Sequence, residues 1–227
     1  MSPINYKQFT ALLPTAYLPS LTYMVVLISS HKAHIELQET YPKQTWRNRC
    51  RINTANGTLD LIVPVNKPQG NHTKTRNVKT SNHEKWQAMH WRAMNSAYGK
   101  TPYFMFYKDL LAPFYVNTYS GLLWQFNWDL LETIGKELGM QIPLCTTKVY
   151  EKNPRGMTDF RNAIVPKNTG SNHTLVCHWP AYYQVFSERS GFVADLSIID
   201  LLFHIGPDSV QYLEEACQHL VGYPMEG

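Results

Sequence analysis

The chain has 227 residues, of which 44% are hydrophobic and 17% charged, and its formal net charge is +4. This composition supports a large hydrophobic core and excludes disorder as a description of the whole chain, so we expect a single compact domain over residues 1–227. The small net charge also excludes a protein whose whole surface coats nucleic acid or an anionic membrane.

The first third of the chain alternates short apolar runs with turn signals. An Asn-Gly turn at residues 56–57 precedes one of these runs, and Ser20 is placed to cap another. The pattern predicts strands at residues 9–17, 33–37 and 58–65, with a capped helical segment at 21–28.

The middle of the chain has helical periodicity. Ser81 and Glu84 have the spacing of a capping box, and the helix that follows is predicted to end near Gly99. Its predicted core face is Trp86, Met89, His90, Ala93 and Ala97. Another helix is predicted over residues 121–138, capped by Gly139, with the core face Leu123, Asn127, Leu130, Ile134 and Leu138.

The last quarter of the chain contains a loop and a helical end. Residues 151–174 are rich in turn signals and are predicted as loop. Ser197 and Asp200 are spaced as a capping pair, and a break is predicted at Gly206-Pro207. A final amphipathic helix should turn Val210, Leu213, Cys217 and Leu220 inward. N-terminal strands, a helical middle and a C-terminal helix together indicate an α/β fold.

Positive charge is concentrated between Lys43 and Lys108. This window holds twelve basic and two acidic residues, a net charge of +10, whereas the rest of the chain carries −6. Aromatic residues are interleaved with these cations, among them Trp46, Trp86, Trp91, Tyr98 and Tyr103. The combination favours an anionic ligand that carries a ring or a sugar, and the alternative is a solvated basic face.

The densest part of this window is residues 41–49. If the segment is extended, alternate residues share a face, so Lys43, Thr45, Arg47 and Arg49 project to one side and Gln44, Trp46 and Asn48 to the other. Arginine and lysine can hold phosphates while asparagine binds a hydroxyl, which predicts a site for a phosphorylated sugar. The alternative is an edge strand that its cations keep soluble.

Few side chains are candidates for acid–base chemistry. His90 lies on the predicted apolar helix face, where it is either a general base or a buried hydrogen-bonded histidine. Asp200 lies in an apolar run, where it is either a buried acid with a raised pKa or the capping partner of Ser197. Glu36 and Glu39 are either paired catalytic carboxylates or salt-bridge partners of cations such as Lys43.

Common catalytic fingerprints are absent from the sequence. It has no glycine-rich dinucleotide motif, P-loop, zincin motif or hydrolase elbow, and its four cysteines lack the spacing of a zinc site. Its early apolar run, residues 24–28, is far shorter than the ~20 residues needed to span a bilayer. We therefore expect a cytoplasmic protein with free thiols, no metal site and no membrane span; the sequence identifies no cofactor.

Six motifs in order resemble the WbqC-like protein family, in the compact form found in Bacteroidetes. They are Tyr17-Leu18-Pro19, the segment 41–52, Val63-Pro64-Val65-Asn66-Lys67, Trp86-x3-His90-Trp91, the segment 97–104 and the segment 196–203. Two departures are visible: Leu13 stands where the family's opening has glutamine, and His204 stands where its closing motif has asparagine.

The resemblance implies a role in O-antigen or other surface-polysaccharide biosynthesis, with glycyl or acyl transfer to a sugar as the suggested chemistry. We therefore expect a transferase that modifies a nucleotide-linked or lipid-linked sugar. In this hypothesis Lys43, Arg49 and Lys67 hold phosphates, Tyr17, Trp46 and Asn48 contact the rest of the substrate, and His90 with Asp200 transfers protons.

Two other classes of function compete with the transferase. A nucleic-acid binder could use the same basic and aromatic window, although the sequence lacks the signatures of known nucleic-acid-binding motifs, so nucleic acid is the less favoured partner. A non-catalytic assembly factor would instead expose an apolar patch, with Tyr103, Phe104 and Phe106 as candidates.

Overall fold

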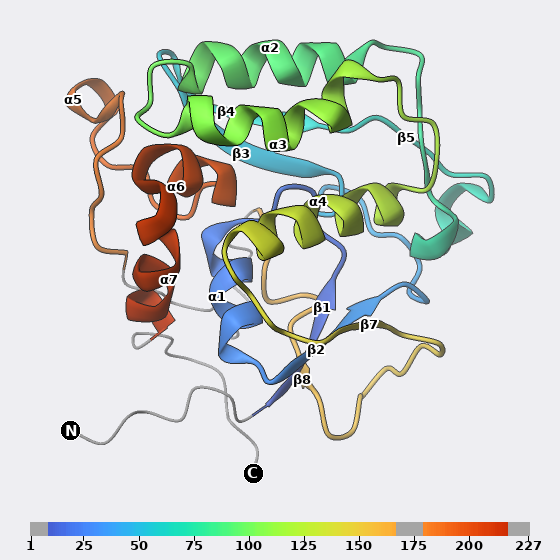
Figure 1. The fold of residues 1–227 in the computed structure, drawn as a ribbon. Coiled ribbons are helices and arrows are strands. Elements are labelled where there is room, and N and C mark those ends of the chain that lie inside the picture. Colours follow the sequence, from blue (N-terminus) through green and yellow to red (C-terminus); the bar gives the residue numbers. More distant parts are fainter. Residues whose placement is uncertain (1–8, 167–178, 218–227) are drawn as a thin grey trace, which may run out of the picture.

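A four-stranded sheet of parallel strands lies at the centre of the computed structural model, which describes residues 9–166 and 179–217 (Figure 1). The strands lie in the order β7 (Leu144–Thr146), β2 (Lys32–Glu36), β1 (Thr10–Pro14) and β8 (Thr158–Asp159). In β1, Ala11, Leu12 and Leu13 are all buried, as expected for a parallel strand covered on both faces.

Helix α1 (Leu21–Ser29) connects β1 to β2 and completes a βαβ unit. Ser20 caps it as predicted, accepting a hydrogen bond from the backbone N–H of Tyr23. The chain later adds β7 beside β2 and then returns to the other side of β1 with β8. The direction in which strands are added therefore reverses between β1 and β8.

An antiparallel hairpin and three helices form the middle of the chain. The hairpin pairs β3 (Arg49–Thr54) with β4 (Gly57–Ile62), and Gly57 has the positive φ of +98° that the tight turn requires. Helices α2 (Trp86–Tyr98) and α3 (Phe104–Val116) pack side by side, and α4 (Leu123–Glu137) follows them (Figure 1). The short elements are β5 (Val65–Asn66), β6 (Lys79–Thr80), η1 (Gly70–His72) and η2 (Thr75–Asn77).

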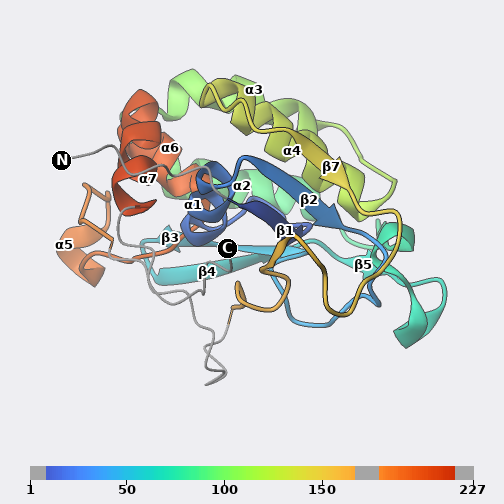
Figure 2. The ribbon, with the colours of Figure 1, turned by 90° about the horizontal axis from the view of Figure 1, so that it is seen from below.

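The C-terminal part consists of α5 (Ser187–Ser190), α6 (Ile198–Ile205), η3 (Gly206–Asp208) and α7 (Ser209–Cys217). Helix α7 packs on α1, as Figures 1 and 2 both show. Leu213 of α7 is buried as predicted and Val210 is half-buried, whereas Leu220 and the side chain of Cys217 lie outside the described part. The predicted α/β fold class is confirmed.

Three predictions about the helices and loops are wrong in detail. The capping box at Ser81 and Glu84 does not form, because α2 begins only at Trp86. Its buried stripe is rotated, so that Met89 is exposed while Met94 and Tyr98 are buried, because α2 packs on both β3 and α3. The predicted loop at 151–174 contains β8, and residues 167–174 lie outside the described residues.

The predicted capping pair at the start of α6 is also wrong. The helix begins after Ser197 as expected, but the Ser197 hydroxyl donates to the carbonyl of Leu18 at 2.7 Å. The Asp200 carboxylate accepts hydrogen bonds from other residues, which are described below.

Across residues 9–166 and 179–217, no helix has the length and apolar character needed to cross a bilayer.

Candidate functional site

The carboxyl ends of β1, β2, β7 and β8 meet at one side of the sheet, which we call the carboxyl edge. In open α/β sheets, ligands bind outside the carboxyl ends of the strands at the point where the strand order reverses. Here that point lies between β1 and β8. The segments that leave the four strands are therefore the first place to look for a site.

Five charged side chains gather at this edge, and we call them the edge ion cluster: Glu36, Glu39, Arg47, Asp159 and Arg161. Nη1 of Arg161 lies 3.2 Å from Oε2 of Glu36, while its Nε and Nη2 lie 2.9 and 2.5 Å from the two carboxylate oxygens of Asp159. Nε of Arg47 donates to Oε1 of Glu39 at 2.7 Å. Arg47 also reaches the backbone carbonyl of Arg161 at 3.5 Å, so the two arginines join segments far apart in sequence.

The members of the cluster differ in their access to solvent. The side chains of Arg47, Arg161 and Glu36 are at most 4% exposed, whereas those of Glu39 and Asp159 are 11% and 30% exposed. Burial raises the pKa of Glu39 above its ordinary value, although Arg47 opposes the shift. A ligand at this edge would therefore meet Glu39 and Asp159, with the two arginines behind them.

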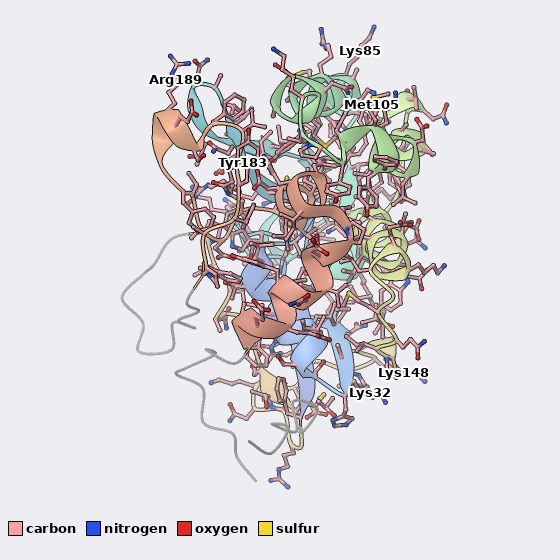
Figure 3. The ribbon with its side chains drawn as sticks, turned by 60° about the vertical axis from the view of Figure 1, so that its left-hand side comes forward. Lys32, Lys85, Met105, Lys148, Tyr183 and Arg189 are labelled. Carbon is pink, nitrogen blue, oxygen red and sulfur yellow. The ribbon has the colours of Figure 1, made fainter. Side chains whose placement is uncertain are left out.

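Exposed cations lie on the segments that contact the cluster. The backbone of Arg76 donates to the carbonyl of Leu37 just after β2, and the carbonyl of Lys152 accepts from Arg161. Lys148 follows Thr147, whose hydroxyl donates to Glu36 at 2.8 Å, and its side chain is exposed (Figure 3). Lys43, Lys74, Arg76, Lys148 and Lys152 are all exposed on the segments around this edge. Such a rim attracts anionic ligands.

The N-terminus of α1, a common phosphate site in α/β folds, is already occupied. The backbone N–H of Thr22 donates to the carboxylate of Asp195 at 2.7 Å, and that of Leu21 donates to the carbonyl of Leu196 at 3.0 Å. An acidic side chain of the chain itself thus takes the position that a bound anion would have. A ligand phosphate at the carboxyl edge would depend on the cationic side chains instead.

Two of the predicted site residues, Tyr17 and His90, are in direct contact. The Tyr17 hydroxyl lies 2.9 Å from Nδ1 of His90 and 2.8 Å from the hydroxyl of Tyr115. Burial lowers the pKa of His90 to about 4, and the backbone carbonyl of Ile62 partly opposes this shift. The backbone N–H of Tyr17 also donates to the carbonyl of Trp46 at 3.0 Å, which brings three predicted residues together.

Residues 41–49 do not form the continuous extended segment that the predicted alternation of faces requires. Residues 43–48 form bends and a turn, and Gln44 has a φ of +57°, so the expected alternation of faces is lost. Thr45, Trp46 and Arg47 are buried one after another, while Lys43 is exposed. The turn directs Arg47 toward Glu39 instead of toward solvent.

The other predicted binding residues lie around the hairpin. Nδ2 of Asn48 donates to the carbonyl of Val63 at 2.8 Å and thereby helps to fix the start of β3 beside the end of β4. Arg49 lies 4.0 Å from the carboxylate of Asp60, and Lys67 is half-buried in the following segment. None of these three contacts the edge ion cluster through a hydrogen bond or ion pair within the described residues.

Asp200, the second predicted catalytic residue, is fully buried. Its carboxylate accepts hydrogen bonds from the hydroxyls of Tyr98 at 2.9 Å and Tyr182 at 2.6 Å and from Nε2 of Gln184 at 3.1 Å. His90 and Tyr98 are eight residues apart on α2, about 12 Å along its axis, so His90 and Asp200 occupy different networks. Their catalytic roles stay predictions.

Sequence reasoning missed three of the edge residues: Thr147, Asp159 and Arg161. All three follow or end very short strands and belong to no recognisable motif. Asn127 is buried as predicted and also joins two loops of the edge, because Nδ2 donates to the Thr15 hydroxyl at 3.0 Å and to the Arg47 carbonyl at 2.8 Å. Within the described residues, no three His, Cys, Asp or Glu side chains gather as metal ligands.

Comparison with known proteins decides the family. The profile of the WbqC-like protein family matches residues 15–176, which is more than half of the chain. The chain belongs to the WbqC-like family. It is also similar to the uncharacterised protein Rv1507c of Mycobacterium tuberculosis, with 27% identity over 225 residues that cover 89% of this chain and 96% of that protein. No solved structure matches this WbqC-like chain.

Proposed function

We propose that the chain is a transferase of surface-polysaccharide biosynthesis that binds a nucleotide-linked or lipid-linked sugar at the carboxyl edge. The observation that supports this most directly is the position of the edge ion cluster at the reversal between β1 and β8, inside a rim of exposed cations. Phosphate groups of the donor or acceptor would meet Lys43, Lys148 and Arg76 at this rim.

The predicted binding residues divide into two groups in this proposal. Lys43 and Lys67 are reached by solvent and contact the ligand directly. Tyr17, Trp46 and Asn48 position the loop after β1 and the start of the hairpin through hydrogen bonds, and Arg49 does so through its ion pair with Asp60. Their loss would weaken binding by loosening these loops rather than by removing a contact to the ligand.

Glu39 is the side chain best placed to accept a proton. In an acyl or aminoacyl transfer, an amine or hydroxyl of the sugar attacks the carbonyl carbon of an activated donor. The new amide or ester bond forms, the bond to the donor's leaving group breaks, and the proton of the attacking group passes to Glu39. A carboxylate with a raised pKa and partial exposure suits this role. His90 and Asp200 are buried, so their predicted roles require separate tests.

Binding can be tested with charge-matched variants. The purified chain is titrated with UDP-N-acetylglucosamine, UDP-galactose and a polyprenyl-phosphate sugar, at low and at physiological salt. The rim double variant Arg76→Ala/Lys148→Ala should lower the affinity at least tenfold. The control Lys85→Ala/Arg189→Ala makes the same charge change at exposed positions away from the edge, and Figure 3 shows both side chains pointing outward. Equal losses in both variants, or no binding by any probe, would refute the site.

Catalysis is tested in a second measurement. The chain is incubated with the sugar and a mixture of activated acyl and aminoacyl donors, and the sugar product is detected by mass spectrometry. Glu39→Gln should retain sugar binding and lose transfer. If Glu39 accepts the proton, His90→Ala and Asp200→Asn should reduce transfer only in proportion to their loss of folded protein. Full transfer by Glu39→Gln contradicts that assignment.

The assembly-factor alternative is favoured by one observation on α3. Met105, which Figure 3 labels, and Phe106 are 62% and 76% exposed, whereas Phe104 is buried. A photo-crosslinking residue at Phe106 should capture an enzyme of polysaccharide synthesis in cells, and the same probe at exposed Val149 should not.

The nucleic-acid alternative is weakened, because Trp46, Trp86 and Tyr98 are buried and offer no stacking surface.

A further inference from the structure

A groove that includes no member of the edge ion cluster runs between α4 and the edge strand β7. It has a volume of about 430 Å³ and is lined by Trp124, Gln125, Trp128 and Asp129 of α4 and by Leu144–Thr146 of β7. We call it the α4 groove. A second cavity, of about 200 Å³, adjoins it and shares Trp128 and Leu144. None of these residues has a role in the proposed transfer reaction.

We propose that the α4 groove binds an uncharged sugar ring. Trp124 and Trp128 are four residues apart, so both indoles lie on the same side of α4. Both are half-buried and line the groove. Large rigid aromatic rings offer flat apolar surface with a polar edge, which suits the C–H face of a pyranose.

The polar groups of the groove include donors as well as acceptors. The indole N–H of Trp124 is buried and has no hydrogen-bond partner within the part of the chain that the structure describes. Gln125 and Thr146 each offer a donor and an acceptor, and Asp129 offers a carboxylate. β7 is an edge strand, so the sheet leaves backbone groups free along its outer side. A ligand that satisfies this set must both donate and accept, as sugar hydroxyls do.

The charges of the groove argue against two other ligand classes. Asp129 lies in the groove, which disfavours an anion, whereas Glu132 of the adjoining cavity is balanced by Lys136, 4.0 Å from its carboxylate. Burial, followed by the nearby Glu132, raises the pKa of Asp129. An ammonium ion could use the indoles and the carboxylate, but it would leave the donors of Gln125 and Thr146 without an acceptor. A neutral polyhydroxylated ring satisfies all of these groups.

This inference goes beyond the proposed transferase and does not rest on it, because a chain that only binds sugars would also satisfy it. The two sites are nevertheless close neighbours along β7. Thr146 lines the groove, and the next residue, Thr147, donates to Glu36 of the edge ion cluster. If both proposals hold, one sugar could lie in the groove while the phosphate-bearing partner lies at the rim.

The first test follows the indole N–H signals by NMR, with the Trp124 signal assigned through Trp124→Phe. The probes are the methyl glycosides of glucose, galactose and N-acetylglucosamine, with choline as the cationic arm and glucose 6-phosphate as the anionic arm. At least one neutral glycoside should shift the Trp124 signal and saturate at about millimolar concentration. Trp128→Ala should weaken this binding at least tenfold, and the exposed control Tyr183→Ala should not change it.

A second readout uses Cys145, a half-buried free thiol in the wall of the groove. Its alkylation rate, measured by peptide mass spectrometry to separate it from the other cysteines, should fall several-fold at saturating glycoside. This readout works in the unaltered chain, so the inference remains testable if Trp128→Ala fails to fold. The inference is overturned if no neutral glycoside shifts the Trp124 signal, if choline or glucose 6-phosphate binds more tightly, or if alkylation of Cys145 is unchanged.

Discussion

The backbone N–H of Thr22 donates a hydrogen bond of 2.7 Å to the side chain of Asp195, which approaches the first turn of α1 from the segment before α6. Asp195 itself has a φ of +51°, an unfavourable value for a residue other than glycine. The contact therefore fixes a strained residue against the helix that follows β1. The phosphate that we propose at the carboxyl edge would therefore have to rely on lysine and arginine side chains.

The Asp195 contact predicts a specific dependence of stability on pH. Burial raises the pKa of Asp195 to about 6, against opposing hydrogen bonds from Thr22 and Ser20. Between about pH 4 and pH 6 the folded chain thus holds a proton that the unfolded chain has lost, so this contribution to the free energy of unfolding falls as pH rises. Asp195→Asn should remove that component in urea titrations. An unchanged slope, relative to exposed Asp208→Asn, would contradict it.

His90 should show the opposite dependence. Burial lowers the pKa of His90 to about 4, so below about pH 6.5 the unfolded chain binds a proton that the folded chain does not bind. The free energy of unfolding should therefore fall as the pH is lowered toward 4. Imidazole ¹⁵N NMR should show a neutral ring at pH 5. His90→Gln should flatten the decline, whereas substitution of the exposed His83 should not. A charged His90 ring at pH 5 would disprove the prediction.

We expect Asp200 to stabilise the folded chain by accepting buried hydrogen bonds. Asp200→Ala leaves the hydroxyls of Tyr98 and Tyr182 without their acceptor and removes one of the acceptors of Gln184, and should cost about 3 kcal/mol or more of unfolding free energy. Asp200→Asn retains one acceptor oxygen and should cost less. The matched control is Asp208→Ala, at an exposed aspartate on the neighbouring η3. Chemical denaturation of the three variants decides the matter, and equal stability of Asp200→Ala and the control would contradict this role.

Gly206 should tolerate no side chain. Its φ is +58°, and a Cβ there would lie 2.5 Å from the ring of Tyr103, whose backbone is held by a hydrogen bond to Phe203. Gly206→Ala should destabilise the chain by about 3 kcal/mol, combining backbone strain with overpacking. Gly156→Ala, at a similar φ of +69° but in open space, should cost only about 1 kcal/mol. Thermal unfolding that shows equal losses would mean that the Tyr103 ring moves aside easily.

The sequence predicted those elements whose own residues show a periodic apolar pattern or a capping residue. Helix α4 was found because five core residues recur at helical spacing and Gly139, with a φ of +64°, ends the helix. Strand β1 and capped α1 were found for similar reasons. Helix α3 was missed because Pro113 lies within it, and β7 and β8 were missed because strands of three and two residues show no periodicity.

The candidate site was only partly predictable for a different reason. The sequence offered two interpretations of Glu36 and Glu39, as salt-bridge partners or as paired catalytic carboxylates. Both do form salt bridges, but with Arg161 and Arg47 and not with Lys43. Arg161 lies 125 residues from Glu36, so no local pattern could connect them. The turn at Gln44, which reverses the faces of the following residues, has a positive φ without glycine and gives no signal in the sequence.

The late position of β8 has a consequence for how the chain folds during synthesis. β1 can pair with β2 as soon as the first βαβ unit emerges, but its other side has to wait for Thr158–Asp159. Contacts between residues so far apart close slowly, because a long loop has to be ordered first. We expect a chain arrested before Thr158 to leave one side of β1 unpaired and the carboxylate of Glu36 without Arg161, which would make such nascent chains clients for chaperones.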